Sequence, residues 1–260
     1  MKATRDSYGE ALLELGKENT NIVVLDADLA TATKTVEFKN TFPERFFDMG
    51  IAEQDMIGTA AGLAIGGKIP FASTFAIFAS GRAYDQIRNG VCYSKLNVKI
   101  AASHAGITVG EDGASHQALE DIALMRAIPN LTVFSPCDDT ETKWIVREAS
   151  KLNGPVYIRL TRPKVEEIYA PSVNFEFGKA VQHGEGNDAT IIATGVTVAE
   201  SLKAQKELKE KEINVRVLDV HTIKPLDEET ILRAAKESKA IFTVEDHSII
   251  GGLGGAVCEL

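Results

Sequence analysis

The sequence predicts a doubly wound, mostly parallel α/β sheet followed by a smaller α/β domain. Short β-branched apolar runs alternate with segments of helical spacing, which is the order expected of strands joined by crossover helices. A stretch with two prolines and mixed charge interrupts this alternation once, which is typical of a linker. We therefore expect a first domain over residues 1–163, a linker over 164–180 and a second domain over 181–260.

The elements follow from the hydrophobic pattern in chain order. The chain opens with Tyr8, Ala11, Leu12 and Leu15 at i, i+3, i+4 and i+7, which predicts an amphipathic helix. The strands predicted after it in the first domain are residues 21–26, 46–49, 69–74, 97–103, 131–136 and 155–160. Helical spacing falls between them at residues 53–66, 76–90, 117–126 and 138–152.

The second domain restarts the alternation with fewer elements. Strands are predicted at 189–195, 214–220 and 240–246, with helices near 197–211 and 227–238. A further helical segment follows "GGLGG" shortly before Leu260. With only three strands visible, we expect this second sheet to be incomplete and the domain truncated.

Composition excludes several classes of protein. The net charge of −9 argues against a nucleic-acid partner bound through a basic face. The most apolar stretch, residues 57–80, is broken by Lys68 and Pro70, so it does not predict a membrane span. The three cysteines lie far apart, which predicts neither a disulfide framework nor a metal site and suits a cytoplasmic protein.

Polar clusters follow the predicted strands, where open α/β sheets gather their ligands. In "FFDMGIAEQDM", residues 46–56, Glu53 either meets the positive end of a helix dipole or faces a ligand. In "STFAIFASGR", residues 73–82, Phe75 and Phe78 are either core residues or one wall of a cofactor pocket. The sequence pattern alone leaves both alternatives open.

The turn "GEDGASHQ", residues 110–117, differs from a phosphate-binding loop. Glu111 and Asp112 would repel phosphates, so the glycines do not form a P-loop. With His104 and His116 nearby, the turn suits hydroxyl recognition and proton transfer, although a solvated turn capped by Ser115 explains it equally well.

Several of these motifs together resemble the transketolase family. The chain is similar to its pyrimidine-binding half over "FFDMGIAEQDMIGTAAGLA", "PFASTFAIFASGRAYDQIRN", "HAGITVGEDGASHQALEDIALMRAIPNLTVFSPCD" and "PVYIRLTRP". "TIKPLD" and "VEDHSIIGGLGGAV" resemble the family's C-terminal domain. The closest likeness is to the C-terminal chain of split, two-subunit transketolases, which transfer a two-carbon ketol unit between sugar phosphates of the pentose phosphate pathway.

The resemblance implies a role for each matching residue. Glu53 matches the glutamate that hydrogen-bonds the aminopyrimidine of thiamine diphosphate, and a carboxylate sequestered by apolar neighbours can share a proton with a ring nitrogen. The remaining matches are Phe75 and Phe78 for the pyrimidine pocket, Asp28 near the cofactor interface, His104 and Arg162 for the sugar phosphate as local cations, Asp112 for a sugar hydroxyl and His116 for acid–base catalysis.

The sequence departs from the family pattern at two positions. Gly81 stands where many members have a third aromatic residue, and Ala32 replaces a phosphate-binding serine, whose contact is lost or moves to Thr31 or Thr33. The chain also lacks the G-D-G motif through which this family binds Mg²⁺ and the diphosphate. We therefore expect an N-terminal companion subunit to bring the metal, with association into a dimer or heterotetramer.

Three other functions compete with this reading. A 1-deoxyxylulose-5-phosphate synthase usually lacks the acidic pair Glu111–Asp112, and pyruvate dehydrogenase beta-type subunits lack the histidine arrangement of "GEDGASHQ". A catalytically silent assembly or regulatory subunit gains weight from Gly81 and Ala32. It loses weight because several polar groups are kept together at strand ends, where they are unfavourable without a ligand.

Overall fold

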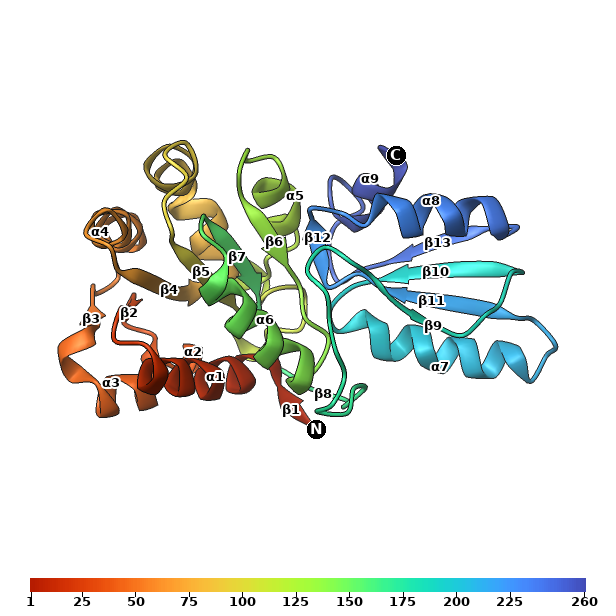
Figure 1. Ribbon diagram of the computed structural model, residues 1–260, viewed down its shortest axis with the longest axis horizontal. Helices are drawn as coiled ribbons and strands as arrows, with labels where there is room; N and C mark the ends of the chain where they lie inside the picture. Colours follow the sequence, from red (N-terminus) through yellow and green to blue (C-terminus); the bar gives the residue numbers. More distant parts are fainter.

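The computed structural model describes residues 1–260, which form a seven-stranded sheet, a four-stranded sheet and a two-stranded ribbon (Figure 1). The first half of the chain contains β1 (Lys2–Ala3), α1 (Thr4–Glu18), β2 (Ile22–Asp26), α2 (Ala30–Thr33), α3 (Val36–Thr41), η1 (Pro43–Arg45), β3 (Phe46–Asp48), α4 (Glu53–Ile65), β4 (Ile69–Phe75), η2 (Phe78–Arg82), η3 (Gln86–Cys92), β5 (Lys99–Ser103), η4 (Gly110–Asp112), η5 (Ala114–His116), α5 (Asp121–Arg126) and β6 (Thr132–Phe134).

The second half contains α6 (Asp139–Lys151), β7 (Val156–Arg159), β8 (Lys164–Val165), β9 (Val181–His183), β10 (Ala189–Ala193), α7 (Thr197–Lys209), β11 (Val215–Asp219), β12 (Thr222–Lys224), α8 (Glu228–Glu237), β13 (Ile241–Val244) and α9 (Leu253–Cys258). None of the helices combines the length and the hydropathy needed to cross a bilayer.

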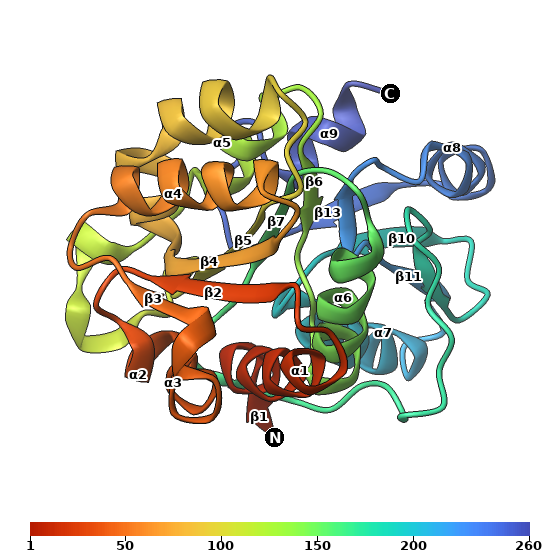
Figure 2. The same cartoon turned by 60° about the vertical axis from the view of Figure 1, so that its left-hand side comes forward.

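The large sheet has the order β12-β6-β7-β5-β4-β2-β3. All its pairings are parallel except that of β12 with β6. The inner strands β2, β5 and β7 are buried along their whole length, as expected where helices cover both faces. Figure 2 shows α1 and α6 on one face and α4 and α5 on the other.

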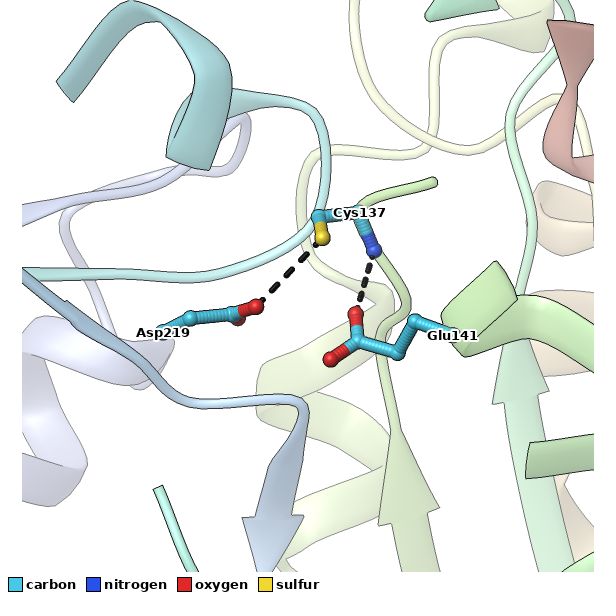
Figure 3. Close-up of side chains that lie close together, drawn as sticks. All are labelled: Cys137, Glu141 and Asp219. Carbon is cyan, nitrogen blue, oxygen red and sulfur yellow. Dashed lines mark hydrogen bonds between the residues drawn. The ribbon is translucent and has the colours of Figure 1, made fainter. Parts of the chain in front are cut away.

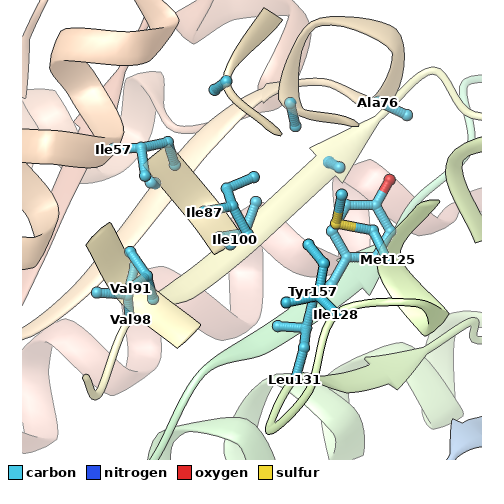
Figure 4. Close-up of a cluster of buried hydrophobic side chains, with 14 of the residues drawn as sticks. Ile57, Ala76, Ile87, Val91, Val98, Ile100, Met125, Ile128, Leu131 and Tyr157 are labelled. Carbon is cyan, nitrogen blue, oxygen red and sulfur yellow. The ribbon is translucent and has the colours of Figure 1, made fainter. Parts of the chain in front are cut away.

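Two apolar layers hold these helices to the sheet. Ile57 of α4, Ile87 and Val91 of η3 and Met125 of α5 pack on Ile100 in the layer drawn in Figure 4. The opposite layer includes Tyr8, Leu12 and Leu15 of α1, which confirms the amphipathic helix predicted at the start of the chain. These layers fix the carboxyl ends of the parallel strands at a common edge.

The small sheet has the order β13-β10-β11-β9. Val198 of α7 packs on one of its faces, and Ile231 of α8 with Leu253 of α9 packs on the other. The prediction of three strands was therefore wrong by one. The extra strand, β9, runs antiparallel to β11 at the sheet edge and has only three half-buried residues, so its sequence carries no clear apolar alternation.

Other local predictions also need correction. Residues 76–90 are not one α-helix, because η2 and η3 are wound as π-helices. The helix predicted over 117–126 begins only at Asp121. Within the predicted linker, β8 forms a ribbon with β1 through the pairs Lys2–Val165 and Ala3–Lys164.

The two sheets are joined by chain segments that cross between them. Thr222 of β12 lies in sequence between β11 and β13 of the small sheet, yet it pairs with Phe134 of β6 in the large sheet. Beside this crossing, Cys137, Glu141 and Asp219 point toward one another (Figure 3). The Cys137 thiol donates to Asp219 Oδ2 at 3.3 Å, and the Cys137 N–H donates to Glu141 Oε2 at 2.7 Å.

The sulfur and carboxyl oxygens of this cluster lie within 4.8 Å of one another, a spacing that could suit a metal ion. Burial nevertheless raises the pKa of the Cys137 thiol and of the Glu141 and Asp219 carboxyls, and repulsion from neighbouring carboxylates, Asp138 among them, adds to the effect. A metal ion would bind here only by displacing the protons that these raised pKa values favour. We therefore describe the cluster as a hydrogen-bonded contact between the two sheets.

Candidate functional site

The residues singled out from the sequence gather at the carboxyl edge of the large sheet. The parallel strands β2, β4, β5 and β7 end at that edge, and the loops that follow them carry the polar groups. The residues singled out from the sequence are Asp28 after β2, Glu53 at the start of α4, Phe75 and Phe78 at the end of β4 and in η2, His104 after β5, Asp112 and His116 in η4 and η5, and Arg162 after β7.

Glu53 is a deeply buried acidic group at this edge. It is the first residue of α4 and only 1% of it is exposed. Arg82 Nη1 donates to both carboxylate oxygens of Glu53, at 3.0 Å each, while 49% of the Arg82 side chain is exposed. Sequence reasoning missed Arg82, although it is part of the quoted segment, because the π-helical winding of η2 directs it toward Glu53.

The aromatic residues form a compact group next to this ion pair. The rings of Phe75 and Phe78 are stacked with centroids 5.8 Å apart, and the imidazole of His104 stacks on Phe75 at 3.8 Å. His116 meets Phe78 edge-on at 5.3 Å. The guanidinium carbon of Arg82 lies 4.3 Å from the Phe78 centroid, so one arginine contacts both Glu53 and the aromatic group.

His104 is buried and held in one orientation. Arg5 Nη1 donates to His104 Nε2 at 3.1 Å, so the imidazole proton is on Nδ1 and Ser103 Oγ is its acceptor at 2.9 Å. Burial, reinforced by the charge of Arg5, lowers the pKa of His104 to about 4. The imidazole is therefore neutral at pH 7 in this chain, which favours a role for His104 as a hydrogen-bonding group and not as a local cation.

Arg5 supplies the positive charge at this position, and the sequence analysis overlooked it. Its Nη1 also donates to the carbonyl of Ala32 at 3.0 Å, while its Nε is buried without a partner. Arg5 belongs to α1 and lies 99 residues from His104, so no local pattern links the two. A cation in the first turn of an amphipathic helix, on the side of the sheet edge, was the signal that could have pointed to it.

Arg162 is tied to the acidic turn. Its Nη2 lies 2.5 Å from Glu111 Oε1, and its Nη1 also donates to the Val109 carbonyl. Asp112 is exposed and makes no side-chain hydrogen bond within the chain. The charge of Asp112 interacts electrostatically with the charges of Arg5 and Arg162. The three side chains therefore lie near one another at the sheet edge.

The loop after β2 lines the neighbouring hollow. Asp28 and Thr31 contribute to an open depression of about 430 Å³ at the surface. Asp28 is exposed and has a left-handed backbone with φ of 61°, a strained conformation that often marks a functional site. The hydroxyl of Thr33 is buried and bonded to Asp26 at 2.6 Å, which leaves Thr31 as the exposed hydroxyl of this loop.

Together these residues form part of a ligand-binding site in which polar groups surround stacked aromatic rings. The edge offers a protected carboxylate, stacked rings, two arginines near a neutral histidine, and an exposed aspartate. Buried polar atoms usually find partners, and Arg5 Nε and Thr74 Oγ1 at this edge have none within the chain. Such a set fits an aromatic heterocycle with a polar, anionic substrate beside it.

Comparisons with known proteins agree with this description. Residues 1–167 match the family model "Transketolase, pyrimidine binding domain", and residues 178–260 match "Transketolase, C-terminal domain". The fold and the site thus define a pyrimidine-binding domain of the thiamine diphosphate type followed by a smaller α/β domain. The chain belongs to the transketolase family.

Relatives of known name extend over nearly the whole chain. A Methanocaldococcus jannaschii protein, provisionally named as the C-terminal section of transketolase, is 57% identical over 100% of this chain and 82% of its own length. The 6-deoxy-6-sulfo-D-fructose transketolase subunit of Clostridium sp. (strain MSTE9) is 46% identical over 98% of this chain and 79% of its own. Human transketolase is 44% identical over 98% of this chain, but only 41% of its own length is covered.

Solved structures give the same result. A structure described as a split gene transketolase, inactive beta4 tetramer, matches with a TM-score of 0.93 and 55% identity over 100% of this chain and 84% of that one. Transketolase from Campylobacter jejuni matches with a TM-score of 0.83 and 25% identity over 99% of this chain and 44% of that one. The chain is therefore of the transketolase type, and the competing functions gain no support from these comparisons.

Proposed function

We propose that this chain is the pyrimidine-binding subunit of a transketolase that uses thiamine diphosphate and transfers a two-carbon ketol unit between sugar phosphates. The observation that carries the proposal is Glu53, which is 1% exposed and has no partner within the chain except the half-exposed Arg82. A buried carboxylate at a ligand-binding sheet edge is unfavourable unless a ligand uses it.

The chain's residues fit one end of the cofactor. Glu53 would hold a proton at a ring nitrogen of the aminopyrimidine, and Phe75 and Phe78 would stack on the ring, with Asp28 near the interface. When bound, thiamine diphosphate supplies a carbon nucleophile that accepts the ketol fragment. The burial of the Glu53 carboxylate keeps water away from it, which would strengthen its hydrogen bond to the ring.

The substrate would lie on the other side of the aromatic group. Arg5 and Arg162 are the cations for a terminal phosphate, and the neutral His104 accepts from Arg5 and keeps that arginine in place. Asp112 is free to accept a hydrogen bond from a sugar hydroxyl. His116 is half-buried against Phe78 and would move a proton to or from the reacting hydroxyl.

The proposal requires a second subunit. This chain contains no G-D-G segment, so Mg²⁺ and the diphosphate would be bound by an N-terminal transketolase subunit, within a dimer or heterotetramer in the cytoplasm. The three cysteines are all unpaired, which suits a reducing compartment.

The test is reconstitution with a candidate N-terminal subunit. The mixture, supplied with thiamine diphosphate and Mg²⁺, should convert a ketose phosphate donor and an aldose phosphate acceptor, while either subunit alone should not. Glu53→Ala should abolish turnover and leave the fold intact. Substantial activity of this variant would rule out the role assigned to Glu53.

A separate comparison in the same assay tests which anionic group the substrate carries. Phosphate and sulfonate are both tetrahedral oxyanions, and one relative is named for a sulfonated ketose. A donor with a terminal phosphate should therefore be compared with its sulfonate analogue under the same conditions. We expect the phosphate to give the higher kcat/KM, and the reverse order would reassign the substrate class.

A further inference from the structure

Arg82 has a position that the proposed function does not explain. Its guanidinium donates to both oxygens of Glu53 at 3.0 Å and lies 4.3 Å from the centroid of Phe78. It is thus a planar N–H donor that uses a buried carboxylate and an aromatic face at the same time. A planar heterocycle with a protonated ring nitrogen would need the same two contacts.

The burial of the pair shows which group must move. Glu53 is 1% exposed, whereas 49% of the Arg82 side chain faces solvent. Arg82 is the only side chain that hydrogen-bonds the Glu53 carboxylate, so a ligand that reaches the carboxylate from solvent meets Arg82 first. Because the arginine of this pair is half-exposed and can be hydrated when it leaves, the pair can be exchanged for a ligand.

The local backbone leaves room for that movement. Arg82 is the last residue of the π-helix Phe78–Arg82, in which the Ala83 N–H bonds to the Phe78 carbonyl at 3.2 Å. This wider turn puts Arg82 over Phe78, and π-helical turns are frequent at functional sites. A Cβ built on the neighbouring Gly81 would meet no atom within 4 Å, so open space adjoins the arginine.

We propose that Arg82 is a displaceable gate that caps Glu53 and covers Phe78 until the aminopyrimidine of thiamine diphosphate takes its place. The gate rests on the proposed function, because it assumes that Glu53 and Phe78 receive the cofactor. It sets the affinity of the complex for the cofactor, since every binding event must first break the Arg82–Glu53 pair.

The first experiment measures access to Glu53 in the chain alone, without any cofactor. A carbodiimide with a small amine labels exposed carboxyls, and peptide mass spectrometry reads the extent of labelling at each site. Glu53 should be protected in the wild type and labelled at least about threefold faster in Arg82→Met, which keeps the length of the stem but removes the donors. The exposed Glu111 and the buried Glu141 serve as internal references that should not change.

The second experiment measures binding of thiamine diphosphate to the reconstituted complex with Mg²⁺ by calorimetry. Arg82→Met should tighten binding about three- to tenfold, the range expected when a half-exposed ion pair and a cation–π contact no longer compete. Arg82→Lys keeps the charge and should stay within about twofold of the wild type. Arg88→Met, at an exposed arginine of the next π-helix, is the matched control and should change nothing.

The outcomes separate the gate from the proposed function. If Arg82→Met binds the cofactor equally or more weakly while Glu53→Gln still loses it, the gate is wrong and the proposed function stands. If Glu53 is labelled equally in the wild type and in Arg82→Met, the gate is also wrong. If the wild-type complex binds no thiamine diphosphate, both the gate and the proposed function are wrong.

Discussion

Replacing Glu53 by Gln separates a catalytic role from a helix-capping role. Glu53 and Asp55 are both acidic residues in the first turn of α4, and both would meet the positive end of its dipole. Only Glu53 is buried, and only Glu53 is bonded to Arg82. If the dipole were the reason for Glu53, then Glu53→Gln and Asp55→Asn should have similar effects.

The contacts of Glu53 set the expected size of the stability change. Gln has nearly the same shape and keeps one oxygen that can accept from Arg82, so no cavity forms. Arg82 is half-exposed and can be hydrated, so no buried charge is left without a partner. We therefore expect a loss of at most about 1 kcal/mol in the free energy of unfolding, or about 2–4 °C in Tm for a chain of this size.

The effect on turnover should be far larger. Placement of a proton on a reacting group contributes a factor of about 10² to 10⁴, equivalent to about 3–5 kcal/mol. The assay is ketol transfer by the reconstituted complex at saturating thiamine diphosphate, with thermal unfolding of the isolated subunit measured in parallel. Equal kcat values for Glu53→Gln and Asp55→Asn would refute the reasoning, and so would a Tm loss large enough to account for the lost activity.

Three further predictions follow from other contacts. Arg5→Met should raise KM for a phosphorylated donor about tenfold or more with a smaller change in kcat, because a charge-assisted hydrogen bond contributes about 1.5–3 kcal/mol. Steady-state kinetics with phosphorylated and unphosphorylated donors tests this prediction, and equal effects on both donors would contradict it. Asp112→Ala should chiefly weaken discrimination among acceptor sugars, and unchanged relative rates would reject that role. Burial raises the pKa of the Glu141 carboxyl, so its contribution to stability is complete below the ordinary value of about 4 and is lost as the pH rises through the raised value. Denaturant unfolding at pH 5 and pH 8 should therefore show that Glu141→Gln gains about 1 kcal/mol or more of unfolding free energy relative to the wild type at the higher pH. A difference between the two proteins that stays constant with pH would contradict the assignment.

The elements with strong periodic patterns could be predicted from the sequence. Each predicted strand of the first domain has a counterpart in the large sheet, because strands covered on both faces read as continuous apolar runs. The short strands β9 and β12 could not be predicted in this way. Each has three residues, and each is defined by a partner strand that lies far away in sequence.

The candidate site could likewise be predicted from the sequence only in part. Residues of the quoted motifs lie together at one edge because parallel strands deliver their carboxyl ends to one place. Arg5 was missed because its partner His104 follows the distant strand β5, and Arg82 was missed because a π-helix rotates it away from α-helical spacing. The neutrality of His104 also needs the structure, since burial and a neighbouring arginine lower its pKa.

The most direct measurement is a structure of the reconstituted complex with thiamine diphosphate and Mg²⁺. We predict that a Glu53 carboxylate oxygen lies within hydrogen-bond distance of a pyrimidine ring nitrogen, with the diphosphate on the companion subunit. A complex that holds the whole cofactor on the companion subunit, with Glu53 still bonded only to Arg82, would contradict this assignment.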